Sequence, residues 1–281
     1  MIDPNDYAFL CQLLHRHIGL ALGPGKEYLV QSRLAPVAAS LGHTGLPALV
    51  SSLRMLPSQR DVKLVCEAMT TNESLFFRDG APFDLLRDRA LPELMQARAA
   101  SRRLRIWCAA ASTGQEPYSV AMTLAGIPAL SGWRVEIIGT DYSAAALDRA
   151  RAGVFTHFEV QRGLPIQMLV KHFAREGDDW RISPALRQAV SFREGNLLES
   201  FGHLGTFDLV LCRNVLIYFD LPTKRQVLDR MAGQLAPDGY LFLGAAETVL
   251  GVSERWERVS GASTSVYRPA TGAALPLSRA S

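Results

Sequence analysis

Five short apolar runs recur from residue 103 onward, and each is bounded by turn residues. Between most of them lie segments with the length and spacing of crossover helices, at 116–126, 143–151 and 223–235. The runs are Arg105–Ala109, Val135–Asp141, Ala189–Phe192, Phe207–Cys212 and Tyr240–Gly244. Strands that alternate with helices form a mostly parallel sheet with helices on both faces. The sequence therefore predicts an α/β fold here.

The chain before residue 80 has a helical repeat instead. Apolar residues return at three- and four-residue spacing from Tyr7 onward, and similar stripes follow in 27–41, 46–55 and 58–68. Glycine and proline residues between the stripes mark turns. We therefore expect a small helical domain over 1–80, which a helix at about 82–99 joins to the larger domain over 81–270.

Two segments depart from these patterns. The connection 154–188 is longer than a crossover helix needs, and it contains a candidate strand at Trp180–Ile182. We expect an inserted small β-subdomain at about 158–188. The final residues, 271–281, are rich in Ala, Ser, Gly and Pro, and we expect them to form a disordered tail.

Composition excludes several classes of partner. The net charge is only +3 and no block of consecutive Lys or Arg is long enough to neutralise many phosphates, so we expect no nucleic-acid binding. The cysteines lie far apart, which predicts neither a metal site nor a disulfide framework. Neither a leader peptide nor about 18 uninterrupted apolar residues is found. We therefore expect a cytoplasmic protein that does not insert into a membrane.

The turn after the first apolar run, within Trp107–Ser119, contains a single glycine, Gly114. A pyrophosphate is usually bound by Gly-x-Gly-x-x-Gly, and a P-loop requires Gly-Lys-Ser/Thr. Neither motif is present, which argues against a nicotinamide oxidoreductase. A nucleoside without a phosphate but with a positive centre suits such a turn better, and S-adenosylmethionine is a ligand of this kind.

Two carboxylates lie where such a ligand would need them. Asp141 ends the second strand at a spacing close to that of the acidic residue that receives ribose hydroxyls in nucleoside-binding α/β folds. Glu116 follows the turn and can pair with the methionyl ammonium. Simpler roles remain open at this point, because Asp141 can cap the next helix and a first-turn glutamate is favoured by the helix dipole.

Other polar residues follow the predicted strands or precede aromatic residues. Asn196 and Asn214 lie at strand ends, where ligands bind in open parallel sheets. The segment Thr70–Asp79 holds polar residues before two phenylalanines; an alternative is that Asn72 or Ser74 caps a helix and the rings are core. Tyr218 can likewise be a core tyrosine with a satisfied hydroxyl.

Taken together, these motifs resemble the CheR family of chemotaxis receptor methyltransferases. Members carry an Asn-x-Thr-x-Phe-Phe-Arg segment, a Trp-x-Ala-Ala-x-Ser-x-Gly-Glu-Glu-Pro-Tyr-Ser turn, a Thr-Asp strand end and Cys-Arg-Asn-Val-x-Ile-Tyr-Phe. Here the corresponding residues are 72–78, 107–119, 140–141 and 212–219, accompanied by 196–198 and 239–244. The matches run in order from about residue 20 to residue 268.

The resemblance implies a Rossmann-like S-adenosylmethionine-dependent methyltransferase that esterifies glutamate side chains in the cytoplasmic domain of a methyl-accepting chemoreceptor. Arg78 and Tyr218 would face the reacting groups, and no metal is implied. The cofactor site would be lined by Asn72, Ser74, Arg78, Glu116, Asp141, Asn196, Leu197, Asn214 and Val215. The alternative is a non-catalytic S-adenosylmethionine-binding regulator or adaptor in a chemosensory pathway.

The sequence departs from the family pattern at three places. Ser74 replaces the usual threonine and keeps the hydroxyl, whereas Gln115 replaces an acidic residue and loses its charge. The helix at 27–41, strongly basic in relatives, has Arg33 as its only cation. The segment 161–188 resembles the family's β-subdomain but lacks a short glycine-containing insertion, so we do not expect it to bind a receptor-tail pentapeptide.

Overall fold

The computed structural model describes residues 2–270, which form two compact units. One unit contains the chain up to Thr71 together with Tyr218–Thr223. The other contains Asn72–Ile217 and the residues from Lys224 onward. The expected disordered tail, 271–281, lies outside the described residues.

The first unit is helical, as expected. Its apolar stripes meet in a core that includes Leu10, Leu14, Leu34 and Leu49, all fully buried. Two of its helices begin at residues whose side-chain oxygens accept from first-turn N–H groups, namely Asp3 and Ser58. The helices are α1 (Pro4–Ile18), α2 (Glu27–Ser40), α3 (Leu46–Met55) and α4 (Gln59–Met69).

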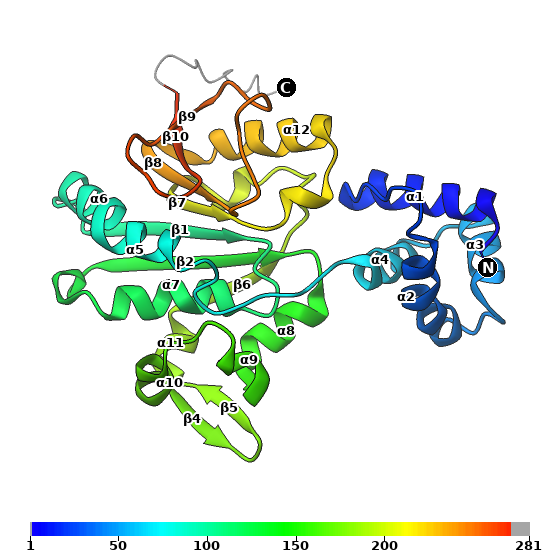
Figure 1. Ribbon diagram of the computed structural model, residues 1–281, viewed down its shortest axis with the longest axis horizontal. Helices are drawn as coiled ribbons and strands as arrows, with labels where there is room; N and C mark the ends of the chain where they lie inside the picture. Colours follow the sequence, from blue (N-terminus) through cyan, green and yellow to red (C-terminus); the bar gives the residue numbers. More distant parts are fainter. Residues whose placement is uncertain (1, 271–281) are drawn as a thin grey trace. The chain divides into compact units, whose positions relative to one another are not determined.

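The described part of the second unit contains a seven-stranded sheet in the order β6-β2-β1-β7-β8-β10-β9 (Figure 1). Its first five strands are parallel, and β10 is antiparallel to both β8 and β9. The predicted parallel sheet is thus confirmed. The strands are β1 (Arg103–Ala109), β2 (Arg134–Asp141), β6 (Val190–Glu194), β7 (Phe207–Cys212), β8 (Leu235–Leu243), β9 (Trp256–Arg258) and β10 (Val266–Pro269).

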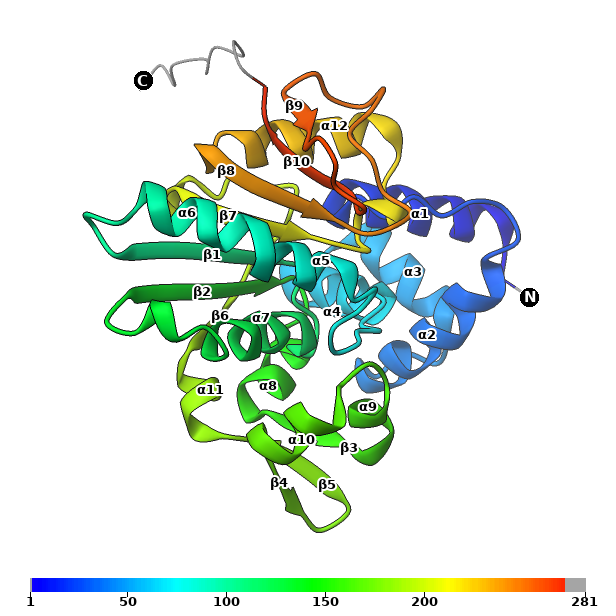
Figure 2. The same cartoon turned by 60° about the vertical axis from the view of Figure 1, so that its left-hand side comes forward.

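Helices cover both faces of this sheet. The connections through α7 (Gln115–Ala125) and α12 (Leu221–Ala232) leave the centre in opposite directions. Right-handed crossovers therefore put these helices on opposite faces. Figure 2 shows α7 in front of the strands and α12 behind β8. The other connecting helices are α8 (Ala144–Ala152), η2 (Pro128–Leu130), η3 (Gly202–Leu204) and η4 (Leu216–Tyr218).

The helix expected at 82–99 is interrupted. It consists of α5 (Ala81–Leu85), a π-helical turn η1 (Leu86–Ala90) and α6 (Leu91–Ala97). Pro92 explains the interruption, because it has no N–H to donate to the carbonyl four residues earlier and its ring clashes with that carbonyl. A π-turn opens the helix at this point.

The long connection after α8 forms the expected β-subdomain. Its sheet is antiparallel in the order β3-β5-β4, and β5 (Asp179–Ile182) confirms the candidate strand. In Figure 1 the β4–β5 hairpin projects away from the large sheet. The remaining elements are β3 (Val154–Thr156), α9 (His157–Gln161), α10 (Ile166–His172), β4 (Phe173–Glu176) and α11 (Pro184–Gln188).

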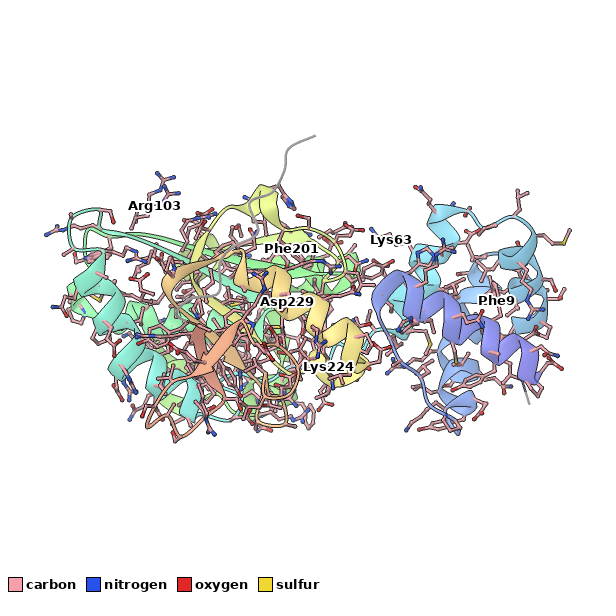
Figure 3. All side chains as sticks on the ribbon, turned by 90° about the horizontal axis from the view of Figure 1, so that it is seen from above. Phe9, Lys63, Arg103, Phe201, Lys224 and Asp229 are labelled. Carbon is pink, nitrogen blue, oxygen red and sulfur yellow. The ribbon has the colours of Figure 1, made fainter. Side chains whose placement is uncertain are left out.

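Trp107 lies at the centre of the large sheet and fixes neighbouring strands. Its ring is fully buried, and its Nε1 donates to Thr140 Oγ1 on β2 over 2.8 Å. The ring also packs against Phe201 and Phe207, with centroids 4.6 and 5.6 Å away. At the amino end of the same strand Arg103 projects outward (Figure 3). The carboxyl end, in contrast, leads into a buried polar turn.

The β-subdomain packs against the segment that follows α4. Phe76 is fully buried and meets the rings of Phe155 and Phe173 edge to face, at 4.9 and 5.6 Å between centroids. Gly163 approaches its backbone so closely that a Cβ there would lie 2.1 Å from the Phe76 carbonyl oxygen. An ion pair between Arg162 and Glu73 adds a surface contact of 2.8 Å. The subdomain thus braces residues 73–76.

This packing predicts the effect of Gly163→Ala. The added methyl group would clash with a backbone carbonyl, and Gly163 also has φ +86°, which strains an alanine. We expect the free energy of unfolding to fall by about 2–4 kcal/mol, together with faster amide exchange in residues 73–77. Gly177→Ala is the matched control, because Gly177 has φ +63° but a Cβ added there would have nothing within 4 Å. Equal effects of the two substitutions in chemical denaturation would contradict the claim that the packing of Gly163 against Phe76 supports residues 73–76.

Arg33, the only cation of α2, serves the helical unit itself. Its guanidinium donates to the carbonyls of Met69 and Thr70, both at 2.9 Å, and to Thr71 Oγ1 at 3.2 Å. These carbonyls lie at the end of α4, where helical partners are lacking. The charge therefore supports the last turn of α4 rather than standing free on the surface of α2.

We predict that Arg33→Ala lowers the free energy of unfolding by about 1–3 kcal/mol, because it leaves terminal carbonyls without a charged donor. Arg60→Ala is the control, since Arg60 is exposed in the first turn of α4. That change should stay within about 0.5 kcal/mol in urea denaturation. Equal stability of the two variants would show that the Arg33 contacts contribute nothing.

Candidate active site

The carboxyl ends of β1 and β7 lie side by side at the point where the sheet order reverses. Ala109 pairs with Cys212, and the chain then turns away in opposite directions toward α7 and α12. Ligands of open parallel sheets bind in the crevice outside such a switch point. The polar residues after these two strands are therefore the first candidates for a binding site.

The turn after β1 reaches its shape with little help from glycine. Ala110 and Ser112 have φ +59° and +51°, values that L-residues other than glycine seldom adopt. Gly114 has φ +96°, and a Cβ there would lie 3.0 Å from that of Ala150, so within the turn this position requires glycine for space. Gln115 is buried and accepts from Thr113 Oγ1 at 2.8 Å. The Gln115 side chain is thus engaged within the turn itself.

Asp141, at the end of β2, supports this turn. Its Oδ2 accepts from the N–H of Ser112 at 2.8 Å and its Oδ1 from the N–H of Ser143 at 2.9 Å. The alternative that Asp141 caps α8 is wrong, because Ser143 is the N-cap and accepts from Ala146 N–H. The buried carboxylate is held by two backbone donors beside the turn.

The segment 72–79 joins the same region. Ser112 Oγ donates to the Asn72 carbonyl at 2.8 Å, and Ser119 Oγ of α7 accepts from Phe77 N–H at 2.9 Å. The alternative in which Asn72 or Ser74 caps a helix is wrong, because the next helix, α5, begins only at Ala81. Phe76 does enter the core, as that alternative supposed.

A buried ion-pair network connects the segment to both strands. The Arg213 side chain is only 1% exposed; it contacts Glu116 Oε2 at 3.0 Å and Asp79 Oδ2 at 2.8 Å. It also donates to the Arg78 carbonyl at 2.8 Å. Burial raises the pKa of Glu116, while the charges of Arg213 and Arg78 oppose that rise. Glu116 therefore has a paired carboxylate, a stronger role than the helix dipole alone would give it.

Four of the other expected site residues follow strands of the large sheet. Gly195 N–H donates to the Asp141 carbonyl, which places Asn196 and Leu197 next to the end of β2. Asn214 and Val215 follow Arg213 directly. Tyr218, in contrast, belongs to the helical unit, where its carbonyl accepts from Ala21 N–H. Its expected role at the reacting groups stays a prediction.

Sequence reasoning missed four residues that shape the site: Arg213, Asp79, Ser119 and Glu247. Arg213 stands inside the Cys-Arg-Asn-Val motif, and its position after a buried strand was a usable signal. Asp79 follows Arg78 directly. No local pattern distinguished Ser119 or Glu247, because each acts on a backbone N–H far away in the sequence.

The donor and acceptor set fits S-adenosylmethionine. The described residues offer two acidic side chains for ribose hydroxyls and an ammonium group, the buried Asp141 and Glu116, whose side chain is 12% exposed. Among these residues Arg213 Nε has no hydrogen-bond partner, and a ligand carboxylate could accept from such a donor. No group of three or more His, Cys, Asp or Glu in residues 2–270 could hold a metal ion.

Comparisons with known proteins agree with this arrangement. The SAM-binding domain of CheR methyltransferases matches residues 72–266, and the all-alpha domain of CheR methyltransferases matches residues 5–69. No helix within the described chain is long and apolar enough to cross a membrane.

Curated relatives match over nearly the whole chain. Chemotaxis protein methyltransferase 1 of Pseudomonas aeruginosa is 41% identical over 94% of this chain and 97% of its own length. Chemotaxis protein methyltransferase 1 of Vibrio cholerae is 40% identical over 92% of this chain and 94% of its own. The chemotaxis protein methyltransferase of Escherichia coli is 34% identical over 88% of this chain and 85% of its own length. The chain therefore belongs to the CheR family of S-adenosylmethionine-dependent methyltransferases.

Proposed function

We propose that this protein transfers a methyl group from S-adenosylmethionine to glutamate side chains in the cytoplasmic domain of a methyl-accepting chemoreceptor. The observation that carries the proposal is the buried Arg213 network. It joins Glu116, after the central strand, to the backbone of Arg78 and to Asp79. A carboxylate proposed to bind the cofactor and the backbone of Arg78, the candidate catalytic residue, are thereby tied to one buried cation.

The proposed cofactor contacts follow from the chemistry of each side chain. Asp141 would accept from the ribose hydroxyls, and Glu116 would pair with the methionyl ammonium. Each carboxylate is already oriented by hydrogen bonds, which lowers the entropy cost of binding. The remaining lining would come from Asn72, Ser74, Arg78, Asn196, Leu197, Asn214 and Val215.

The reaction requires positioning more than proton transfer. S-adenosylmethionine supplies, when bound, a methyl group activated by its sulfonium. A substrate glutamate is ionised near neutral pH, so no general base is needed. Arg78 would attract and orient that carboxylate, and Tyr218 would donate a hydrogen bond to one of its oxygens. Holding the reactants in line can account for several kcal/mol of the barrier.

Incubation with labelled S-adenosylmethionine and a panel of receptor signalling domains tests the proposal directly. The expected product is base-labile methyl label on glutamate residues. Cofactor binding without label on any cognate receptor would instead favour the non-catalytic regulator. That alternative has one supporting observation, since the only cation of α2 is engaged within its own unit.

We predict that Arg78→Ala lowers kcat about 100-fold while it weakens S-adenosylhomocysteine binding less than about tenfold. The reason is that the guanidinium positions the substrate carboxylate in line with the methyl group, and binding of S-adenosylhomocysteine does not involve that substrate carboxylate. Arg87→Ala removes an exposed cation from η1 and is the control. Steady-state kinetics and calorimetry measure the two quantities. An unchanged kcat would remove Arg78 from the reacting centre.

Glu116 predicts a pH dependence of cofactor binding. Its pKa is raised by burial in the free protein, and pairing with an ammonium would lower it again. Binding therefore releases a proton, so affinity falls as the pH drops through the raised pKa, by up to about tenfold per pH unit. Calorimetry with S-adenosylhomocysteine measures this fall.

Glu116→Gln is the matched variant, because it has no carboxyl to titrate. Its affinity should be lower and nearly independent of pH over the same acidic range. A fall with pH that is as steep in Glu116→Gln as in the native protein would assign the titration to another group.

A further inference from the structure

Four backbone N–H groups converge on the carboxylate of Glu247. Its Oε2 accepts from Asn214 at 2.8 Å and from Gly244 at 2.7 Å. Its Oε1 accepts from Val215 at 2.9 Å and from Ile217 at 3.3 Å. The residue is only 5% exposed. The carboxylate therefore lies inside the loop that follows β7 and links it to the end of β8.

These contacts supply hydrogen bonds that secondary structure cannot. Residues 213–215 lie beyond the end of β7 and before η4, so their N–H groups have no sheet or helix partner. A buried N–H without an acceptor is costly, and an ionised carboxylate is the strongest acceptor a side chain offers. The carboxylate of Glu247 thus accepts the hydrogen bonds of three N–H groups in this loop, those of Asn214, Val215 and Ile217.

The loop that it holds is strained and tightly fitted. Asn214 has φ +60°, in the left-handed region that asparagine adopts more readily than most residues but that is still uncommon outside glycine. On the other side of the carboxylate, a Cβ at Gly244 would lie 2.7 Å from Glu247 Oε2 and 2.9 Å from the Asn214 nitrogen. Glycine at 244 lets the strand end approach the loop, so the carboxylate can reach both.

We infer that Glu247 is a positioning residue for the cofactor site, an inference that rests on the proposed function. Its carboxylate fixes the backbone of Asn214 and Val215, the two residues of this loop expected to contact S-adenosylmethionine. Glu247 itself acts through the loop. Loss of its charge would let Asn214 leave its left-handed conformation. The backbone of Asn214 and Val215 would then no longer be held in one position beside the cofactor.

Glu247→Gln tests the inference with little change in volume. The amide keeps one acceptor oxygen but turns an NH₂ donor toward backbone N–H groups, so at least two hydrogen bonds are lost. We expect S-adenosylhomocysteine to bind about 10- to 100-fold more weakly. Amide exchange at Asn214, Val215 and Ile217 should become at least about tenfold faster, whereas exchange in β2 stays as in the native protein.

Glu257→Gln is the matched control, because it removes the same charge from an exposed position on β9. It should change neither quantity. Gly244→Ala disturbs the same contact from the other side and should reproduce the Glu247→Gln signature. Glu247→Asp keeps the charge on a shorter side chain and should give an intermediate affinity, so the inference stays testable if the glutamine variant does not fold.

The outcomes separate the inference from the proposed function. Faster exchange in the loop with unchanged cofactor affinity would show that Glu247 holds the loop without positioning the site, and would overturn the inference. If amide exchange in the loop is unchanged in both Glu247→Gln and Gly244→Ala, Glu247 does not hold the loop, and the inference is overturned. Failure of the native protein to bind S-adenosylhomocysteine would instead refute the proposed function, and the inference with it.

Discussion

The buried guanidinium of Arg213 is the contact on which the rest of the site depends. It touches a carboxylate from α7, a carboxylate after Arg78 and the Arg78 carbonyl, and it lies over the ring of Phe83. A cation with only 1% of its side chain exposed is tolerated only with such partners, and removing one partner of a buried pair costs about 3–5 kcal/mol. Three separate parts of the chain are therefore held to one point.

Backbone strain gathers around this point and explains the glycine-poor turn. Within residues 2–270, the non-glycine residues with positive φ are Phe77, Asp79, Arg102, Ala110, Ser112 and Asn214, and all but Arg102 belong to the site region. Each strained stretch is held by a polar contact: Asp141 on Ser112, Ser119 on Phe77, Glu247 on Asn214. Side-chain hydrogen bonds thus impose the conformations that a phosphate-binding loop obtains from glycine.

The sequence was a good guide where local pattern determines structure. Alternating strands and helices predicted the parallel sheet, and strand ends such as Asp141 pointed to the sheet edge at which the candidate site residues gather. The contacts that hold the site were harder to predict, because Arg213, Ser119 and Glu247 act across long sequence separations. Pro92 was a local signal for the break in the helix expected at 82–99, although the helical periodicity continued past it. The short antiparallel strands β9 and β10, in contrast, depend on pairing within the sheet.

The β-subdomain belongs to the site as much as the sheet does. Arg78 lies in a segment without regular secondary structure, so its precision must come from anchors along residues 72–79. Ser112 and Arg213 anchor the two ends of this segment, while the rings around Phe76 and the close approach of Gly163 anchor the middle. Deleting the subdomain would expose Phe76 and release the middle of the segment. The insertion therefore has a structural task of its own, which is to support residues 72–79, the segment that carries the proposed site residue Arg78.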